Sequence, residues 1–141
     1  MRLPPAMIGH TEAVLREVLR FTGPADGTLS RYFRENPRLG GRERNVIAEA
    51  IYGLLRNKSV YTSFSESGTG SAMRRITLLG LADAVGIDAL GGLSEEEDVW
   101  LRRVMEIDRS HLPLVLKSNM PEWLWQKLST KFGDEEAMKL A

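Results

Sequence analysis

The stretch from Leu39 to Arg56 carries the clearest helical pattern in the chain, and it most restricts the fold. Gly40 and Gly41 break the chain ahead of this helix, and Asn57 follows it. Its apolar residues repeat at i, i+1, i+4, i+5, i+8 and i+9, the spacing of a helix with one broad buried stripe. They are Val46, Ile47, Ala50, Ile51, Leu54 and Leu55. We therefore expect the rest of the chain to be organised around this helix.

Two arginines, Arg42 and Arg44, fall in the first turn of this helix. The helix dipole already places partial positive charge there, so each arginine is unfavourable by roughly 0.3–1 kcal/mol. Neither has a carboxylate three or four residues away with which to pair on the helix surface. We expect a group outside the helix to neutralise this charge, either an acidic side chain from elsewhere in the fold or a phosphate.

Apolar spacing elsewhere predicts further helices and no strand. Residues 72–85 are apolar almost all round, which is typical of a helix enclosed on most sides. Ser94 and Glu97 form a capping-box pattern at the start of another helix, and residues 65–71 have the composition of a flexible loop. The other helical stretches are residues 7–21, residues 24–35 and a weaker one after Arg56. The chain is therefore predicted to be all-α, a compact bundle of about six helices followed by a tail.

Length and composition exclude several classes of protein. A chain of 141 residues makes one domain with a substantial core. It has no cysteine, and therefore no disulfide and no thiol nucleophile. No apolar run is long enough for a membrane span, so we expect a soluble cytoplasmic protein. The net charge is zero, but residues 1–75 hold 12 Lys and Arg against 7 Asp and Glu, whereas residues 76–141 hold 7 against 12. The N-terminal half is thus basic.

Five arginines lie within residues 31–44: Arg31, Arg34, Arg38, Arg42 and Arg44. Arginine binds phosphate through two parallel hydrogen bonds, and a helix N-terminus offers free N–H groups to the same anion. The alternative is an internal network with glutamates or with the acidic C-terminal half. For Arg42 and Arg44 both interpretations stay open, whereas Arg31, Arg34 and Arg38 favour RNA contact. Sequence-specific reading of bases is not expected.

No catalytic or metal-binding motif is present. His10 and His111 are far apart, and neither has the spacing of a metal-ligand pair, so we interpret both as ordinary capping or surface residues. Gly68 and Gly70 lack the third glycine and the lysine of a phosphate-binding loop. Tyr32 lies between two of the arginines, and we expect it to pack in the core rather than to stack on a base.

Two segments resemble one known family. The first is Asn36-Pro-Arg-Leu-Gly-Gly-Arg-Glu-Arg-Asn-Val-Ile-Ala-Glu-Ala-Ile-Tyr-Gly-Leu-Leu-Arg56. It is similar to the signature helix of the NusB-like domain at the N-terminus of Sun/Fmu (RsmB-type) ribosomal RNA cytosine-C5 methyltransferases. The second, Met120-Pro-Glu-Trp-Leu-Trp125 followed by Lys131-Phe-Gly-Asp-Glu-Glu-Ala137, resembles the segment that joins this domain to the catalytic half of the same enzymes.

The resemblance implies a NusB-like bundle over residues 1–111 and the start of a helical linker over residues 112–141. In the family the chain continues into a Rossmann-type domain that binds S-adenosylmethionine. Here it ends at Ala141 within a helical pattern, so we expect a fragment, without the family's catalytic cysteine and cofactor loop and hence with no catalytic residue or cofactor of its own. Trp125 points to a different side of its helix from Trp123, and we expect it to contact the missing methyltransferase domain.

The implied function is that of an RNA-binding accessory domain, which helps to position ribosomal RNA for the missing catalytic domain. Two alternatives stay open. One is a protein-interaction module like the antitermination NusB proteins, which pair with a ribosomal protein. The other is a purely structural brace for the catalytic domain. A membrane partner is not expected.

Overall fold

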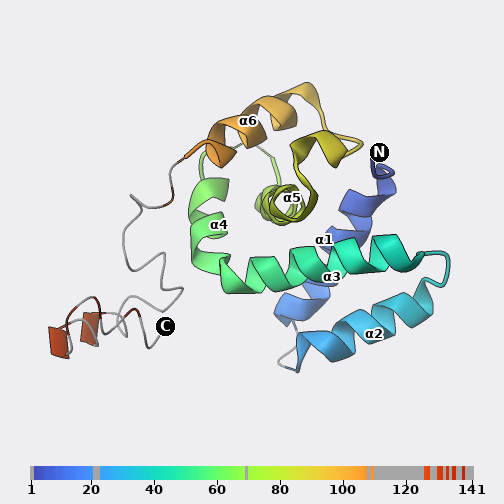
Figure 1. The fold of residues 1–141 in the computed structure, drawn as a ribbon, viewed down its shortest axis with the longest axis horizontal. Coiled ribbons are helices and arrows are strands. Elements are labelled where there is room, and N and C mark those ends of the chain that lie inside the picture. Colours follow the sequence, from blue (N-terminus) through green and yellow to red (C-terminus); the bar gives the residue numbers. More distant parts are fainter. Residues whose placement is uncertain are drawn as a thin grey trace.

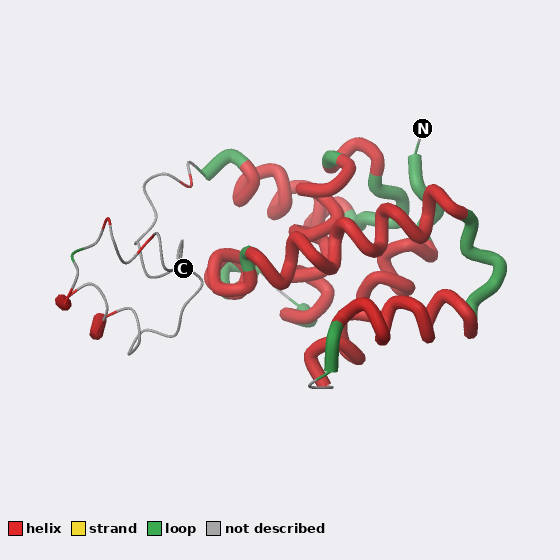
Figure 2. Tube along the Cα trace, turned by 60° about the horizontal axis from the view of Figure 1, so that its bottom comes forward, coloured by secondary structure: helices red, strands yellow, loops and turns green. Residues whose placement is uncertain are grey.

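The computed structural model describes residues 2–20, 23–68, 70–107 and 109, and a few positions between 126 and 138. Over these residues the chain consists of helices and loops without a strand (Figure 2), which confirms the prediction of an all-α chain. Among the described residues, no helix combines the length and the apolar character that crossing a bilayer requires. Trp125 and the expected domain boundary after residue 111 lie outside the described residues.

The described bundle is built from α-helices joined by short connections, with one 3₁₀ turn. The elements are α1 (Ala6–Arg20), α2 (Ala25–Glu35), α3 (Gly41–Arg56), α4 (Lys58–Ser65), α5 (Ala72–Val85), η1 (Ile87–Ala89) and α6 (Glu95–Met105). Each helix that the apolar spacing predicted before residue 108 is present, with ends close to the expected ones. Periodicity and capping residues act within a few positions of each other, which is why they locate helices well.

Helix α5 lies at the centre of the bundle, where Figure 1 shows it end-on. It packs against α1, α3, α4 and α6, and its residues from Thr77 to Ala82 are all buried. The buried hydroxyl of Thr77 donates to the carbonyl of Met73 at 2.8 Å, so its hydrogen bond is satisfied within the helix. The expectation that this helix is enclosed on most sides is confirmed. Helix α3, around which we expected the fold to be organised, forms one wall of the shell around α5.

The contact between α3 and α5 depends on a glycine. The predicted stripe of α3 is buried against α5 at Val46, Ile47, Ala50, Ile51 and Leu54. Opposite it, a Cβ on Gly80 would lie 2.7 Å from Cγ of Leu54 and 3.2 Å from the carbonyl oxygen of Ala50. Both distances are shorter than ordinary van der Waals contact, so the two helices come this close because residue 80 has no side chain.

Helix α2 lies outside this shell, against α1 and α3 (Figure 1). Leu29 is buried there, and Tyr32 and Phe33 pack on the core from partly exposed positions. At the N-terminus, the N–H of Leu3 donates to the carbonyl of Ala89 at 2.7 Å, which anchors the segment leading into α1. These contacts leave the start of α1 facing the connection between α2 and α3.

Residues 65–71 were expected to form a flexible loop; Ser65 instead ends α4, and the described residues of this segment are anchored to α5 and α6. Arg75 donates from Nε to the carbonyl of Ser65 at 2.6 Å and from Nη1 to that of Gly70 at 2.9 Å. The indole Nε1 of Trp100 donates to the hydroxyl of Ser67 at 3.0 Å. Both donors lie outside the segment, so its own composition gave no sign of these contacts.

Arg109 is fixed against α4 and α5. Its guanidinium donates to the two carboxylate oxygens of Asp83 at 3.1 and 3.2 Å. The same group lies 5.6 Å from the ring centre of Tyr61 and 5.7 Å from that of Phe64. Tyr61 is fully buried and donates its hydroxyl to Asp83. This cluster attaches Arg109 to the core.

The capping box predicted at the start of α6 is present. The hydroxyl of Ser94 accepts from the N–H of Glu97 at 3.1 Å, and the carboxylate of Glu97 accepts from the N–H of Ser94 at 2.9 Å. Arg74 on α5 donates to both oxygens of the same carboxylate, through Nε and through Nη2 at 3.0 Å. The Arg74 guanidinium holds the pKa of Glu97 below its usual value.

Replacing Glu97 with glutamine is expected to destabilise the chain by about 1 kcal/mol at neutral pH, because the charge that pairs with the half-exposed Arg74 is lost. A carboxylate whose pKa is lowered by folding contributes stability above its ordinary pKa of 4.5. That contribution disappears as the pH falls through the folded pKa. Urea unfolding of both proteins across this range should therefore show their difference shrinking in acid.

The matched control is Glu96→Gln, an exposed carboxylate in the same helical turn. It should change the free energy of unfolding by no more than about 0.5 kcal/mol. A deficit of Glu97→Gln that is as large in acid as at neutral pH would contradict a role for its charge.

Candidate functional site

The five predicted arginines lie on α2, on the connection that follows it and on the first turn of α3. Three of them are exposed: Arg34 at the end of α2, Arg38 in the connection and Arg42 in the first turn of α3. Within the part of the chain that the structure describes, Arg34 and Arg38 have no hydrogen bond or ion pair. Their guanidinium groups are thus solvated and accessible to an anion.

Arg44 contacts the fold itself. Its Nε donates to the carbonyl of Leu39 at 2.8 Å, and its guanidinium carbon lies 5.6 Å from the centre of the Phe33 ring. We expected an acidic side chain or a phosphate to neutralise the positive charge at the start of this helix. For Arg44 the expectation is corrected: a carbonyl and an aromatic ring contact the guanidinium instead. A carbonyl oxygen accepts a hydrogen bond from a charged donor, and an aromatic face attracts the guanidinium, without adding charge.

Arg31 joins α2 to α1. Its Nη2 lies 3.1 Å from a carboxylate oxygen of Glu17, and the two side chains are 41% and 35% exposed. An ion pair this exposed contributes at most about 1 kcal/mol to stability. Its main consequence here is that Glu17 neutralises much of the positive charge that Arg31 would present to a ligand.

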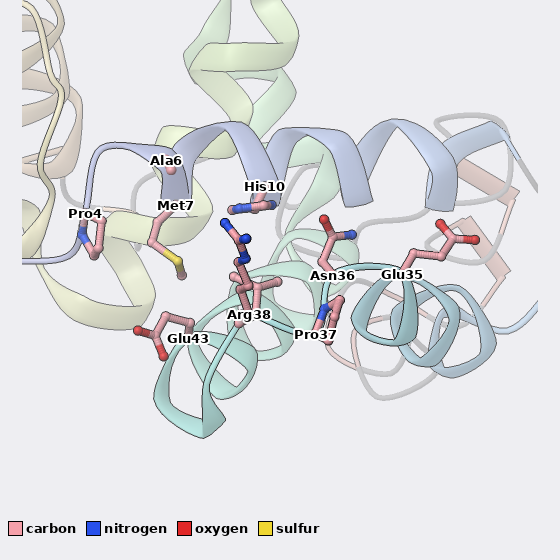
Figure 3. A pocket seen from close by; sticks show the side chains of 10 residues that line it. Pro4, Ala6, Met7, His10, Glu35, Asn36, Pro37, Arg38 and Glu43 are labelled. Carbon is pink, nitrogen blue, oxygen red and sulfur yellow. The ribbon is translucent and has the colours of Figure 1, made fainter.

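A cleft of about 440 Å³ lies between the start of α1 and the connection between α2 and α3 (Figure 3). Figure 3 shows the side chain of Arg38 in the middle of this cleft, beneath His10, with Glu43 toward one end and Glu35 toward the other. We call it the Arg38 cleft; its lining residues are Pro4, Ala6, Met7, His10, Glu35, Asn36, Pro37, Arg38, Leu39 and Glu43. Half of these residues are apolar and the other half carry polar or charged side chains.

His10 is held in place by Tyr32. Its Nδ1 lies 2.6 Å from the Tyr32 hydroxyl, and the two rings meet edge to face, with centroids 5.8 Å apart and planes at 77°. Burial, and then the negative charge of Glu17, raise the pKa of Tyr32. The phenol therefore keeps its proton, and its hydroxyl donates to Nδ1 or accepts from it according to the tautomer of His10.

From the sequence, His10 was expected to be an ordinary capping or surface residue and not part of a site. It lies 22 positions from Tyr32, and no local pattern connects residues that far apart. Tyr32, expected in the core, is only partly buried there and uses its hydroxyl on His10. The side chain of Asn36 also returns to this region, donating from Nδ2 to the carbonyl of Tyr32 at 2.9 Å.

The Arg38 cleft offers groups that can bind a ligand. No lining residue carries a hydroxyl, thiol or amine nucleophile. Within the described residues, no three His, Asp or Glu side chains gather as a metal site requires. What the cleft offers is an apolar floor, a ring face, one guanidinium and carboxylate acceptors.

Comparisons with protein-family models, with curated proteins and with solved structures found no match to this chain. The arrangement of side chains around α2 and α3 therefore carries the functional argument.

Proposed function

We propose that this chain is an RNA-binding accessory domain that contacts phosphates through arginines at the junction of α2 and α3. It would be a NusB-like domain of the kind that precedes the catalytic half of Sun/Fmu methyltransferases, and it would help to position ribosomal RNA for an S-adenosylmethionine-dependent domain. A cytoplasmic location belongs to the same proposal. The observation that carries it is the pair of exposed arginines, Arg34 and Arg38, which have no partner within the described residues.

The charges around this junction support the proposal. A guanidinium that is solvated in the free protein loses little when a phosphate replaces its water, and it releases counterions from the RNA. Arg34, Arg38 and Arg42 are exposed on three consecutive pieces of structure, so one RNA backbone can meet more than one of them. Arg44 and Arg31 serve this surface indirectly, because they fix the connection and α2 in place.

Binding to structured ribosomal RNA with unpaired loops is expected to weaken with salt, with a log–log slope of magnitude about 2–3. Replacing both Arg34 and Arg38 with alanine should flatten this slope by about 1–2 and reduce affinity about tenfold at low salt, since each neutralised phosphate contributes about 0.7–0.9 to the slope. Fluorescence anisotropy at several salt concentrations measures both quantities.

The matched control replaces Lys58 and Arg103 with alanine. Both are exposed, on α4 and α6, and the double change removes the same charge from other elements of the bundle. It should leave the slope within about 0.5 of the original. Equal effects of the two double variants would indicate general charge attraction instead of a site at the junction of α2 and α3.

One observation favours a protein-interaction module as the second candidate. Helix α6 and the residues after it expose Val99 at 60% and Ile107 at 43%. Val99 also lines a cleft of about 590 Å³ with Trp100 and Ser67. A partner protein that covered this cleft would bury the exposed Val99. RNA binding that is absent at low salt would contradict the first proposal and favour this one.

A further inference from the structure

The Arg38 cleft is too acidic inside to favour a phosphate. Two carboxylates, Glu35 and Glu43, line it together with the single guanidinium of Arg38. An anion drawn into the cleft would meet more negative than positive charge, whereas a neutral group with both donors and acceptors would meet matching partners. The cleft and the exposed arginines beside it therefore suit different parts of one ligand, a neutral part and a charged part.

The size and the walls of the cleft suit a flat ring. Its volume of about 440 Å³ falls within the roughly 300–1,000 Å³ of small-molecule sites. Met7 and Leu39 provide a buried apolar floor. The imidazole of His10 is fixed by Tyr32 at 2.6 Å. A base that displaces the Arg38 side chain from beneath it (Figure 3) would meet a fixed aromatic face on which to stack.

The polar groups of the cleft distinguish guanine from the other three bases. Arg38 has donors only, and the Glu43 carboxylate has acceptors only. Neither side chain has a hydrogen bond or ion pair to another described residue. Guanine presents two acceptors, O6 and N7, on one edge and two donors, N1–H and the N2 amino group, on the neighbouring edge. It is the base that offers paired groups to both a guanidinium and a carboxylate.

We propose that the Arg38 cleft binds one unpaired guanine base of a single-stranded RNA segment. Arg38 donates to O6 and N7, Glu43 accepts from N1–H and the N2 amino group, and the ring stacks on His10. Tyr32 is a positioning residue for His10. This inference rests on the RNA-binding function proposed above and deepens it: the guanidinium of Arg38, counted there among the phosphate contacts, contacts the base instead and adds base selectivity to the backbone contact. The phosphates flanking the base remain outside the cleft, near Arg34 and Arg42.

The experiment uses short uridine oligoribonucleotides that carry one central guanosine, adenosine or inosine. The guanosine oligonucleotide should bind about tenfold more tightly than the adenosine one. Inosine lacks the N2 amino group and should bind about threefold more weakly than guanosine. Glu43→Gln should reduce the preference for guanosine over adenosine to about twofold or less, while Glu49→Gln, an exposed carboxylate further along α3, should leave it unchanged.

The outcomes separate this inference from the proposed function. Salt-dependent RNA binding that requires Arg34 and Arg38 but shows no preference among the oligonucleotides would overturn the guanine site and leave the accessory function standing. The absence of any RNA binding would overturn both. A preference for guanosine that survives Glu43→Gln would place the base elsewhere and overturn the assignment of the cleft. Circular dichroism of Glu43→Gln confirms that the variant is folded.

Discussion

Replacing Gly80 with valine is expected to destabilise the chain by about 3 kcal/mol or more, enough to unfold a substantial part of a marginally stable domain. The first added carbon would already lie 2.7 Å from Cγ of Leu54 and 3.2 Å from the carbonyl oxygen of Ala50. The Leu54 atom is a branch point and the Ala50 atom is backbone, so neither can move aside without shifting α3. Two further methyl groups would separate α5 from the stripe that it covers.

Alanine at the same position distinguishes the contribution of packing to the free energy of unfolding from that of helix propensity. It should gain about 1 kcal/mol of helix propensity over glycine and lose more than that to the clash, for a net destabilisation of about 1–2 kcal/mol. Gly9→Ala on α1 is the control, since a Cβ there would meet nothing within 4 Å. That variant should be stabilised by about 0.5–1 kcal/mol. Urea unfolding measures all three, and a stabilised Gly80→Ala would show that α3 and α5 do not pack as described.

Replacing Arg44 with alanine is expected to destabilise the chain by about 2 kcal/mol, the second largest effect that we predict. The change removes a charge-assisted hydrogen bond to the carbonyl of Leu39 and a guanidinium above the Phe33 ring. The first contributes about 1.5–3 kcal/mol and the second about 0.5–1 kcal/mol. Relief of the unfavourable charge at the start of α3 offsets part of this loss, by roughly 0.3–1 kcal/mol.

Arg34→Ala is the matched control for this prediction, because it removes the same side chain from an exposed position without a described partner. Its free energy of unfolding should equal that of the unchanged chain within about 0.5 kcal/mol. Equal stability of the two variants would mean that Arg44 does not hold the connection, and Arg44 would return to the set of arginines available to RNA.

Arg44 also determines where Arg38 lies in the Arg38 cleft. Leu39, whose carbonyl Arg44 holds, is the residue directly after Arg38. The contact therefore positions the connection that carries Arg38 beneath His10 (Figure 3). Arg44, at the start of α3, thus helps to place Arg38, the arginine of the preceding connection for which we propose RNA contact.

The sequence by itself determined the helices. Apolar spacing located α1 to α6, Ser94 and Glu97 marked the start of α6, and the all-round apolar character of residues 72–85 indicated an enclosed helix. Each of these signals depends on residues within about four positions of each other, where backbone geometry alone decides which side chains meet. Such signals therefore locate a helix whatever tertiary contacts it makes.

Only the tertiary structure decided how the arginines differ. Arg31, Arg34, Arg38 and Arg44 belong to one cluster in the sequence, yet Glu17 pairs with the first and Leu39 with the last, while the other two stay solvated. The hydrogen bond between His10 and Tyr32, which lie 22 positions apart, could not be predicted from the sequence either. A long polar side chain takes whichever partner the packed helices bring within reach. That choice depends on how α1, α2 and α3 lie against one another, which no local pattern encodes.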